Sequence, residues 1–343
     1  MSDNGYIVGS NLEKALQAGY FVATGELGPP QSADRKEIEH KAGFLKGVVE
    51  SVNITDNQTA VVRMSSISVG AMLMEMGIEP NIQMTARDRN RIAIQSDLLG
   101  AYALGIRNLL CLTGDHQTFG NHPNAKNVHD VDSISMLQMC RDMRDGKVFE
   151  CGDKIKGQEP RFLLGAASNP FADPFDFRPY RLGKKANAGA DFIQTQIIFN
   201  VPKFAEFMRR VVDMGLHEKT HILAGVAPIR SLGGARYMAN KVPGMEVDPE
   251  YIERMRRSTQ GLPSIKEIKS MDDPDEAKEA RRLRREAAET EGLGIWVEIL
   301  NACKEIEGVA GVHIMAIEWE SAVDGICKAA QVGPKYDPAR QNA

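Results

Sequence analysis

Short apolar runs alternate along the chain with longer amphipathic segments, and the alternation repeats eight times. Short runs of this kind are typical of strands that are buried on both faces. The predicted strands are Tyr20–Glu26, Ser51–Thr55, Asn81–Thr85, Asn108–Thr113, Phe162–Ala167, Phe192–Thr195, His221–Val226 and Gly311–Ala316. Strands that alternate with helices indicate a parallel sheet, and eight repeats indicate closure into a barrel. The pattern therefore predicts an α/β fold, a single (β/α)8 TIM barrel over residues 1–343.

The amphipathic segments between these runs predict the helices that surround the barrel. Four of them are well marked: Arg35–Val49, Asp88–Leu104, Ser133–Asp145 and Val201–Met214. Ser32 or Asp34 could cap the first, and Asp130 or Asp132 could cap the third. We also expect an N-terminal helical extension over residues 1–18 and a helical insertion over residues 243–295, before the last strand. The core of this insertion, Asp272–Glu291, is dense in Glu, Lys and Arg around Ala and Leu, which is typical of an exposed helix.

A polar segment rich in Gly, Asn and His, Gly114–Asp130, follows the fourth predicted strand directly. Loops that follow barrel strands build the catalytic face, so we expect this segment on that face. Its three histidines, His116, His122 and His129, match no zinc-binding pattern. We interpret them as loop or ligand-contact residues, and the sequence predicts no metal site.

Composition and charge narrow the class of protein. The formal net charge is -4, which predicts no basic face and argues against nucleic acid as a partner. The five cysteines are Cys111, Cys140, Cys151, Cys303 and Cys327, and no two of them form a CxxC motif. This pattern favours free, mostly buried thiols in a reducing compartment. There is no signal-peptide pattern and no run of about 18 apolar residues, so we expect a cytoplasmic protein without a membrane span.

Polar residues at the carboxyl ends of strands are the informative ones in a barrel. Glu26 ends the first predicted strand, in ATGELGPP, where Pro29 and Pro30 stiffen the following turn. A carboxyl group in this position could serve as a general acid or base. It could equally be a structural Glu held in a salt bridge, and spacing alone does not separate the two interpretations.

Three further strand ends carry polar side chains. Thr55 and Asp56 could hold polar ligand atoms, although capping of the following helix is the favoured interpretation. Asp115, after the permissive Gly114, could accept a hydrogen bond from a heterocycle or could be a turn residue. Gln196 offers both a donor and an acceptor to an amide-like heterocycle, or could be a satisfied buried amide.

Phosphate-binding patterns are sparse in this chain. Lys184 and Lys185 could meet a phosphate near the barrel mouth, although a solvated lysine pair is the commoner outcome. No GxGxxG motif follows a strand, and no Walker A motif is present. A separate dinucleotide-binding domain is therefore not supported, and any nicotinamide would have to bind the barrel itself.

Taken in order, these segments resemble the methylenetetrahydrofolate reductase family. The resemblance runs from about Gly19 to Ala330. It is carried by GELGPP around Glu26, VNITDN, TARDRNR at 85–91, SDLLGAYALGIRNLLCLTGD at 96–115, DVDSISML at 130–137, GAASNP at 165–170, KKANAGADFIQTQ at 184–196 and GVHIMAIEWE at 311–320. TARDRNR and LGIRNLL…TGD look particularly like the branch whose reductase domain also occurs fused to a homocysteine methyltransferase.

This resemblance implies a flavin-dependent barrel that reduces 5,10-methylenetetrahydrofolate to 5-methyltetrahydrofolate. The cofactor would be FAD, with FMN as the alternative, and the electron donor would be NADH, NADPH or a redox partner protein. The resemblance implies that Glu26 is the proton donor, that Asp115 tunes the flavin and the folate, and that Gln196 binds the pterin. It places the flavin contacts at Thr55, Gln83, Leu112, Thr113, Gly114, Asp115, Ala166, Asn169, Lys184 and Lys185.

The chain departs from the family pattern at three of these positions. Gln83 stands where many members have His, Asn169 where many have Tyr, and Thr113 where some have Arg. The choice between FAD and FMN, and the identity of the hydride donor, therefore stay open at this point.

Two other functions also stay open. One is a barrel methyltransferase that binds methyltetrahydrofolate and needs no flavin. The other is an electron-relay or flavin subunit of a larger complex, in which residues 264–291 would form a docking helix. A solvated surface helix is the favoured interpretation of that segment. A homo-oligomer also remains open.

Overall fold

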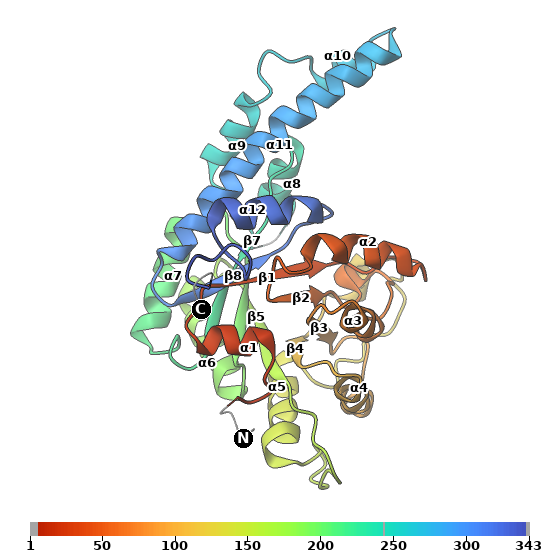
Figure 1. Cartoon of the computed structure of the whole chain (residues 1–343), viewed down its shortest axis with the longest axis vertical. Helices are drawn as coiled ribbons and strands as arrows, with labels where there is room; N and C mark the ends of the chain where they lie inside the picture. Colours follow the sequence, from red (N-terminus) through yellow and green to blue (C-terminus); the bar gives the residue numbers. More distant parts are fainter. Residues whose placement is uncertain (1–5, 243, 341–343) are drawn as a thin grey trace.

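The computed structural model describes residues 6–242 and 244–340, and its centre is a closed parallel barrel (Figure 1). Neighbouring strands pair in chain order, and β8 returns to pair with β1. The strands are β1 (Val22–Leu27), β2 (Ser51–Ile54), β3 (Pro80–Thr85), β4 (Asn108–Leu112), β5 (Leu163–Ser168), β6 (Phe192–Ile197), β7 (His221–Val226) and β8 (Val309–Ile314). The predicted TIM barrel and all eight predicted strands are confirmed.

Helices follow the strands and cover the outside of the barrel. They are α2 (Arg35–Leu45), α3 (Ser66–Glu75), α4 (Arg91–Ala103), α5 (Ser133–Arg141), α6 (Arg178–Ala188), α7 (Val201–Asp213), α8 (Leu232–Lys241) and α12 (Val323–Ala330). Short 3-10 helices are η1 (Gln58–Ala60), η2 (Gln117–Phe119), η4 (Phe175–Phe177) and η5 (Glu320–Ala322), and η3 (Asp142–Gly146) is a short π-helix. The core lies between the strands and these helices, where large side chains such as Phe204, Phe207 and Trp296 are buried.

The four helices predicted in detail are present, and their ends differ where local chemistry decides. Asp34 caps α2 by accepting from the backbone N–H of Lys36, and α2 stops at Leu45 because Lys46 is already extended. The side chain of Asn90 caps α4, which therefore begins at Arg91 rather than at Asp88. Asp132 caps α5, as one of the two predicted candidates, through a capping box.

The short helix α1 (Asn11–Gln17) plugs the end of the barrel at which the strands begin. Leu12 and Leu16 pack there against side chains from inside the barrel, including Phe192. The carboxylate of Glu79 accepts from the N–H of Leu12 at 3.0 Å, which satisfies the free N-terminus of α1. An apolar layer therefore closes the barrel interior at this end.

The predicted insertion, residues 243–295, contains α9 (Pro249–Arg257), α10 (Ile265–Lys269) and most of the long α11 (Pro274–Lys304), which continues past the predicted end to Lys304. Figure 1 shows α10 and the first half of α11 projecting away from the barrel. The second half of α11 buries Ile295 and Ile299 against the barrel. A Cβ at Gly292 would lie 1.9 Å from the carbonyl oxygen of Ile229, so α11 meets the segment after β7 backbone to backbone. Position 243, within the predicted insertion, lies outside the described residues.

The cysteines and the helices bear on two further expectations. Cys111, Cys140, Cys303 and Cys327 are buried, Cys151 is exposed, and all five thiols are free. Within residues 6–242 and 244–340, no helix combines the length and the apolar character that a membrane crossing requires.

Candidate active site

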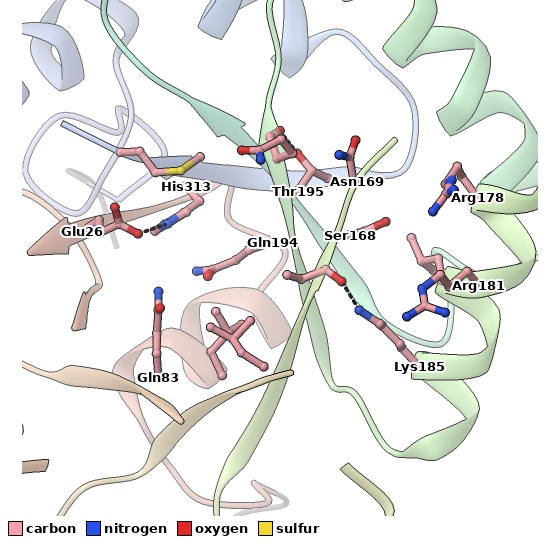
Figure 2. A pocket seen from close by; sticks show the side chains of 16 residues that line it. Glu26, Gln83, Ser168, Asn169, Arg178, Arg181, Lys185, Gln194, Thr195 and His313 are labelled. Atoms are coloured by element: carbon pink, nitrogen blue, oxygen red, sulfur yellow. Dashed lines mark hydrogen bonds and ion pairs between the residues drawn. The ribbon is translucent and has the colours of Figure 1, made fainter. Parts of the chain in front are cut away.

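Two adjoining cavities open at the carboxyl ends of the strands. The first has a volume of about 360 Å³ and is lined by Glu26, Gln196 and His313, among others (Figure 2). The second has a volume of about 290 Å³ and is lined by the turn that follows β4. The residues that line both cavities are Gln83, Leu112, Ala167, Arg181 and Lys185. We refer to the two cavities together as the mouth site.

Polar side chains line the inside of the barrel because they recur at every second position of several strands. Residues two apart on a strand point to the same face of the sheet. Thr24 and Glu26 on β1 therefore point inward together, and so do Gln194 and Gln196 on β6. The mouth site thus stands on a polar layer rather than on an apolar core.

This polar layer is a continuous chain of hydrogen bonds across the barrel. The amide of Asn81 donates to Asn53 at 2.8 Å, and Asn53 donates to Gln194 at 2.6 Å. Gln194 donates to the hydroxyl of Thr24 at 3.3 Å, and that hydroxyl lies 2.9 Å from Nδ1 of His313. All five residues are 3% exposed or less. Buried polar groups with partners on both sides hold fixed orientations, so the His313 ring is held in place from below.

Glu26 meets the upper side of the same histidine ring. Its Oε2 lies 3.5 Å from Nε2 of His313 (Figure 2). Among the described residues, Glu26 therefore has His313 as its ion-pair partner and no Lys or Arg. The Glu26 side chain is 14% exposed, which leaves it open to the first cavity.

His313 is a candidate functional residue that the sequence reasoning missed. It lies inside β8, two residues before Met315, and both residues line the first cavity. The signal was present in the sequence, because a His at an inward position of a strand matches the period-two pattern of Thr24 and Glu26. The prediction considered only residues at the carboxyl ends of the strands, and His313 lies inside a strand.

Two glutamines offer amide groups to the first cavity. The Oε1 of Gln196 accepts from the N–H of Ile197 at 3.0 Å, which leaves the NH₂ of Gln196 free to donate into the cavity. The side-chain amide of Gln83 makes no hydrogen bond to any residue that the structure describes, although Gln83 is only 8% exposed. The Gln83 amide faces the cavity and can pair with a ligand there.

One wall of the mouth site is cationic and is formed by α6. Arg178, Arg181 and Lys185 lie at helical spacing and all line the first cavity (Figure 2). The amine of Lys185 donates to the carbonyl oxygen of Ala167. Burial, together with the neighbouring charge of Arg181, lowers the pKa of Lys185 from 10.5 to about 8. An anionic ligand at this wall would restore the charge that burial disfavours.

The two lysines predicted as a pair have different surroundings. Lys184 is exposed and its amine lies 5.8 Å from the centroid of the Phe177 ring. It lines neither cavity of the mouth site. The expectation of a solvated pair therefore holds for Lys184 but is wrong for Lys185.

The turn after β4 forms the floor of the second cavity. Leu112, Thr113, Gly114 and Asp115 all line it, and Gly114 has a φ of 91°, which favours glycine. The carboxylate of Asp115 is exposed and does not line the first cavity. The structure therefore brings Glu26 and Gln196 into one cavity and places Asp115 in the adjoining one.

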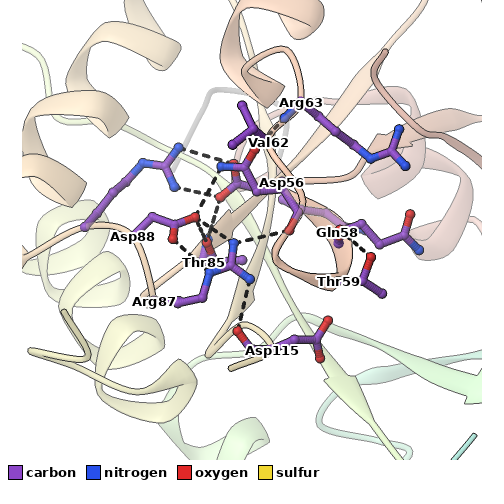
Figure 3. A network of polar contacts seen from close by, with 12 residues as sticks. Asp56, Gln58, Thr59, Val62, Arg63, Thr85, Arg87, Asp88 and Asp115 are labelled. Carbon is purple, nitrogen blue, oxygen red and sulfur yellow. Dashed lines mark hydrogen bonds and ion pairs between the residues drawn. The ribbon is translucent and has the colours of Figure 1, made fainter. Parts of the chain in front are cut away.

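Asp56 is a structural anchor of the second cavity. Its carboxylate accepts from the N–H of Thr85 at 2.9 Å and pairs with Arg89 at 2.6 Å (Figure 3). The favoured expectation that Asp56 caps the next helix is wrong, because α3 begins only at Ser66. Figure 3 also shows Arg87 joining the Asp88 carboxylate to the backbone of Asp115, so the ends of β2, β3 and β4 form one network.

The predicted flavin contacts divide into two groups. The residues that line the mouth site are Gln83, Leu112, Thr113, Gly114, Asp115, Asn169 and Lys185. Thr55, Ala166 and Lys184 line neither cavity. Thr55 and Ala166 are both buried, and the neighbouring inward position, Ala167, lines the cavities in place of Ala166. His116, His122 and His129 also line neither cavity.

The chain is similar to known proteins over most of its length. A family model described as methylenetetrahydrofolate reductase matches residues 11–271. A probable methylenetetrahydrofolate reductase (NADPH) of Caenorhabditis elegans is 27% identical over 193 residues, which cover 55% of this chain and 26% of that protein. Methylenetetrahydrofolate reductase 2 of Schizosaccharomyces pombe is 25% identical over 199 residues, which cover 54% of this chain and 28% of that protein. The matched region thus spans about a quarter of the length of these relatives.

A solved structure shows the same kind of fold. It is described as an uncharacterized protein from Clostridium thermocellum that binds two copies of 5-methyl-5,6,7,8-tetrahydrofolic acid. The two structures align with a TM-score of 0.55, over 94% of this chain and 98% of that one. The sequence identity is 13%, so this likeness supports the barrel fold alone.

Proposed function

Because the chain belongs to the methylenetetrahydrofolate reductase family, we propose that it reduces 5,10-methylenetetrahydrofolate to 5-methyltetrahydrofolate with a bound flavin. The observation that carries the proposal is the position of Glu26. This acid has no Lys or Arg partner among the described residues, faces the same cavity as Gln196, and is held by a histidine at 3.5 Å. A proton donor, a group for heterocycle recognition and a cationic wall thus meet in one site.

The residues of the mouth site fit a flavin. Arg178, Arg181 and Lys185 supply positive charge for its phosphate, and Glu26 is the only acid among the described residues that line the first cavity. The unpaired amide of Gln83 can pair with the polar edge of a flavin ring. A flavin bound here would supply the hydride for the reduction. The second cavity extends the site from Lys185 toward the turn after β4, which favours FAD over the shorter FMN.

Gln196 is proposed to orient the pterin of the folate. Its carbonyl oxygen is already engaged by Ile197, so its NH₂ group can donate to a ring nitrogen or oxygen of the substrate. A fixed donor of this kind holds the reacting carbon in one orientation toward the hydride donor. Asp115 lies at the second cavity, so its proposed role is on the flavin side of the site rather than beside Glu26.

Glu26 is proposed to open the imidazolidine ring of the substrate. It would deliver a proton to N10, the bond from N10 to the methylene carbon would break, and a 5-iminium cation would form. Hydride addition to that methylene carbon completes the 5-methyl product. His313 would keep the carboxyl group aimed at the substrate, because Thr24 and Gln194 fix the histidine ring from the opposite side.

The electron donor is proposed to be NADH or NADPH bound at the barrel mouth, with a redox partner protein as the alternative. The direct test is spectroscopic. The purified chain should absorb near about 450 nm, release FAD on denaturation, and bleach with a reduced nicotinamide. Addition of 5,10-methylenetetrahydrofolate should then restore the absorbance. A colourless protein that still binds methyltetrahydrofolate would contradict the proposal in favour of a flavin-free methyltransferase. A flavoprotein that is not reoxidised by the folate, with or without a partner subunit, would also contradict it.

A further inference from the structure

A third cavity lies outside the barrel mouth and is lined by residues of α8, α10 and α11. Figure 1 shows where these three helices lie relative to the barrel. Its volume is about 630 Å³, and it shares no lining residue with the mouth site. Among the described residues, its lining contains no Asp or Glu but contains six cations: Arg230, Arg236, Lys269, Arg281, Arg284 and Arg285. In a chain with a formal net charge of -4, this local excess of positive charge requires an explanation.

The cations of the long helix α11 differ in their ion pairs. Arg282 lies outside the lining of the third cavity, on what we call the outer face of α11, and forms ion pairs with Glu279 and Glu286. Arg281 and Arg285, which line the cavity, form no ion pair with any residue in the described part of the chain. Like charges four residues apart on a helix repel each other, so this arrangement costs stability unless an anion lies between them.

Two further cations that line the cavity also lack an ion-pair partner among the described residues. Arg236 on α8 and Lys269 on α10 have no acidic partner within residues 6–242 and 244–340. The remaining two are engaged, since Arg230 pairs with Glu289 at 3.0 Å and Arg284 donates to backbone carbonyls. Four cations from three helices therefore surround one cavity without an opposite charge.

The first turn of α8 adds free backbone donors to the cavity. Ser231 caps this helix by accepting from the N–H of Gly234 at 3.0 Å. The N–H groups of Leu232 and Gly233 have no partner within the helix, and both residues line the cavity. A Cβ at Gly233 would approach only the Ser231 hydroxyl, at 3.8 Å, so the backbone here is open to a ligand. A helix N-terminus with open N–H groups attracts phosphate.

The cavity also has an apolar side. Leu232, Ile265, Ile268 and Ala288 line it together with the cations. Ile265 is 63% exposed, so its side chain is available for contact with a ligand. A ligand that matches both sides would carry negative charge at one end and an apolar or aromatic group at the other.

We propose that this third cavity binds a small molecule that joins phosphate groups to an apolar or aromatic part, the chemistry of a nucleoside diphosphate. Arginines bind phosphate through paired N–H donors, and Arg281 and Arg285 are free to do so. The volume lies within the range of about 300 to 1,000 Å³ that is usual for ligand cavities. The proposal is independent of the proposed reductase activity, because the two sites share no residue.

The test is calorimetric titration of the full chain with ADP. Wild-type protein should bind ADP, and the double variant Arg281→Gln/Arg285→Gln should bind it at least about tenfold more weakly. The matched control is Arg282→Gln, which removes one positive charge from the same turn of α11 but from its paired outer face, and it should bind within about twofold of wild type. Lys185→Met separates the two sites, because ADP that enters the mouth site instead would lose affinity in this variant and not in the double variant.

Further ligands test the two halves of the cavity. Pyrophosphate and adenosine should each bind more weakly than ADP, because each contacts one half. Failure of ADP to bind, unchanged affinity in the double variant, or an equal loss in Arg282→Gln would each overturn the proposal. Pyrophosphate binding as tight as that of ADP would overturn the apolar half. Capture by vesicles of anionic phospholipid without ADP binding would replace the small molecule with a membrane surface.

Discussion

The mouth site and the third cavity both collect positive charge, but they hold it in opposite ways. At the mouth, Lys185 is 8% exposed and its amine is fixed on the carbonyl of Ala167. In the third cavity, Arg281 and Arg285 are exposed and have no fixed partner among the described residues. Burial makes the charge of Lys185 conditional, because it lowers the pKa to about 8, whereas an exposed Arg stays charged.

This difference teaches what each region can do. The mouth site rests on a buried network in which neighbouring side chains are joined by hydrogen bonds, so it can hold a reacting group in one geometry. The third cavity can attract and hold an anion, but nothing in it orients a group for chemistry. Substitutions at the mouth site should therefore change the turnover of folate. Substitutions around the third cavity should change only the affinity of that cavity for its anionic ligand.

The sharpest test of this contrast is the removal of the acid. Glu26→Gln keeps the size of the side chain but cannot donate the proton that ring opening needs. Turnover of 5,10-methylenetetrahydrofolate should fall by about 10²- to 10⁴-fold, while the flavin spectrum and thermal stability stay unchanged. Glu289→Gln, at the acid that pairs with Arg230 beside the third cavity, is the matched control and should retain full turnover. Substantial turnover by Glu26→Gln would remove Glu26 from the acid role.

A smaller effect is expected at the residue that positions this acid. His313→Leu should lower kcat by about ten- to a hundredfold and change the KM for folate much less, because the proposed role of His313 is to position Glu26, which it contacts at 3.5 Å. His313→Gln, which keeps a polar group toward Thr24, should recover part of the loss. The pH profile of kcat should shift in both variants. If KM rises while kcat and the pH profile stay fixed, His313 has only a structural role.

The architecture could be predicted because strands that are buried on both faces leave a regular pattern of short apolar runs in the sequence. Eight apolar runs with helices between them leave few alternatives to a closed parallel barrel. The ends of the strands then pointed to Glu26, Asp115 and Gln196, and all three do line the mouth site. What the strand ends could not show is that Asp115 lies in the second cavity and not beside Glu26.

The sequence pattern could not predict the surroundings of residues whose position depends on the rotation of a helix or on a partner that is distant in the chain. Lys184 and Lys185 are neighbours in the chain, but about 100° of helix rotation separates them, and only packing decides which one faces the barrel. Asp56 has the residue type of a helix cap, yet its partner is Thr85, on the next strand. The spacing of Arg181 and Lys185, four apart on one helix, was the overlooked sign of a cationic wall.

The buried lysine predicts a pH dependence that the third cavity should not share. Lys185 has a folded pKa of about 8 against an ordinary value of 10.5, so the unfolded chain binds more protons between these values. Lys185 therefore makes the free energy of unfolding rise with pH across this window. Below about pH 7 the lysine is protonated in both states, so it adds no pH dependence there. A phosphate group needs the charged amine, so flavin affinity should fall by up to about tenfold as the pH rises above about 8.

Titration of flavin binding between pH 6.5 and pH 9.5 checks this prediction, with the range set by the lowered pKa. Lys185→Arg should bind flavin without the decline, because guanidinium keeps its charge throughout. ADP binding to the third cavity, where three of the four unpaired cations are Arg, should stay nearly flat over the same range. If the flavin affinity of the mouth site and the ADP affinity of the third cavity fall equally with pH, deprotonation of Lys185 is not the cause of the decline.

The smallest effect is expected on the outer face of α11. Arg282 is 47% exposed, and its ion pairs with Glu279 and Glu286 are held in open solvent. Exposed pairs of this kind contribute little, because water screens the charges and two long side chains must be ordered. Arg282→Gln should therefore shift the midpoint of urea unfolding by less than about 0.3 M. A clearly larger loss, measured on the isolated chain and again at higher protein concentration, would mean that this face is covered in solution. The exposed-helix interpretation of Asp272–Glu291 would then give way to a docking surface, and the contrast between a catalytic mouth and a solvated protrusion would no longer hold.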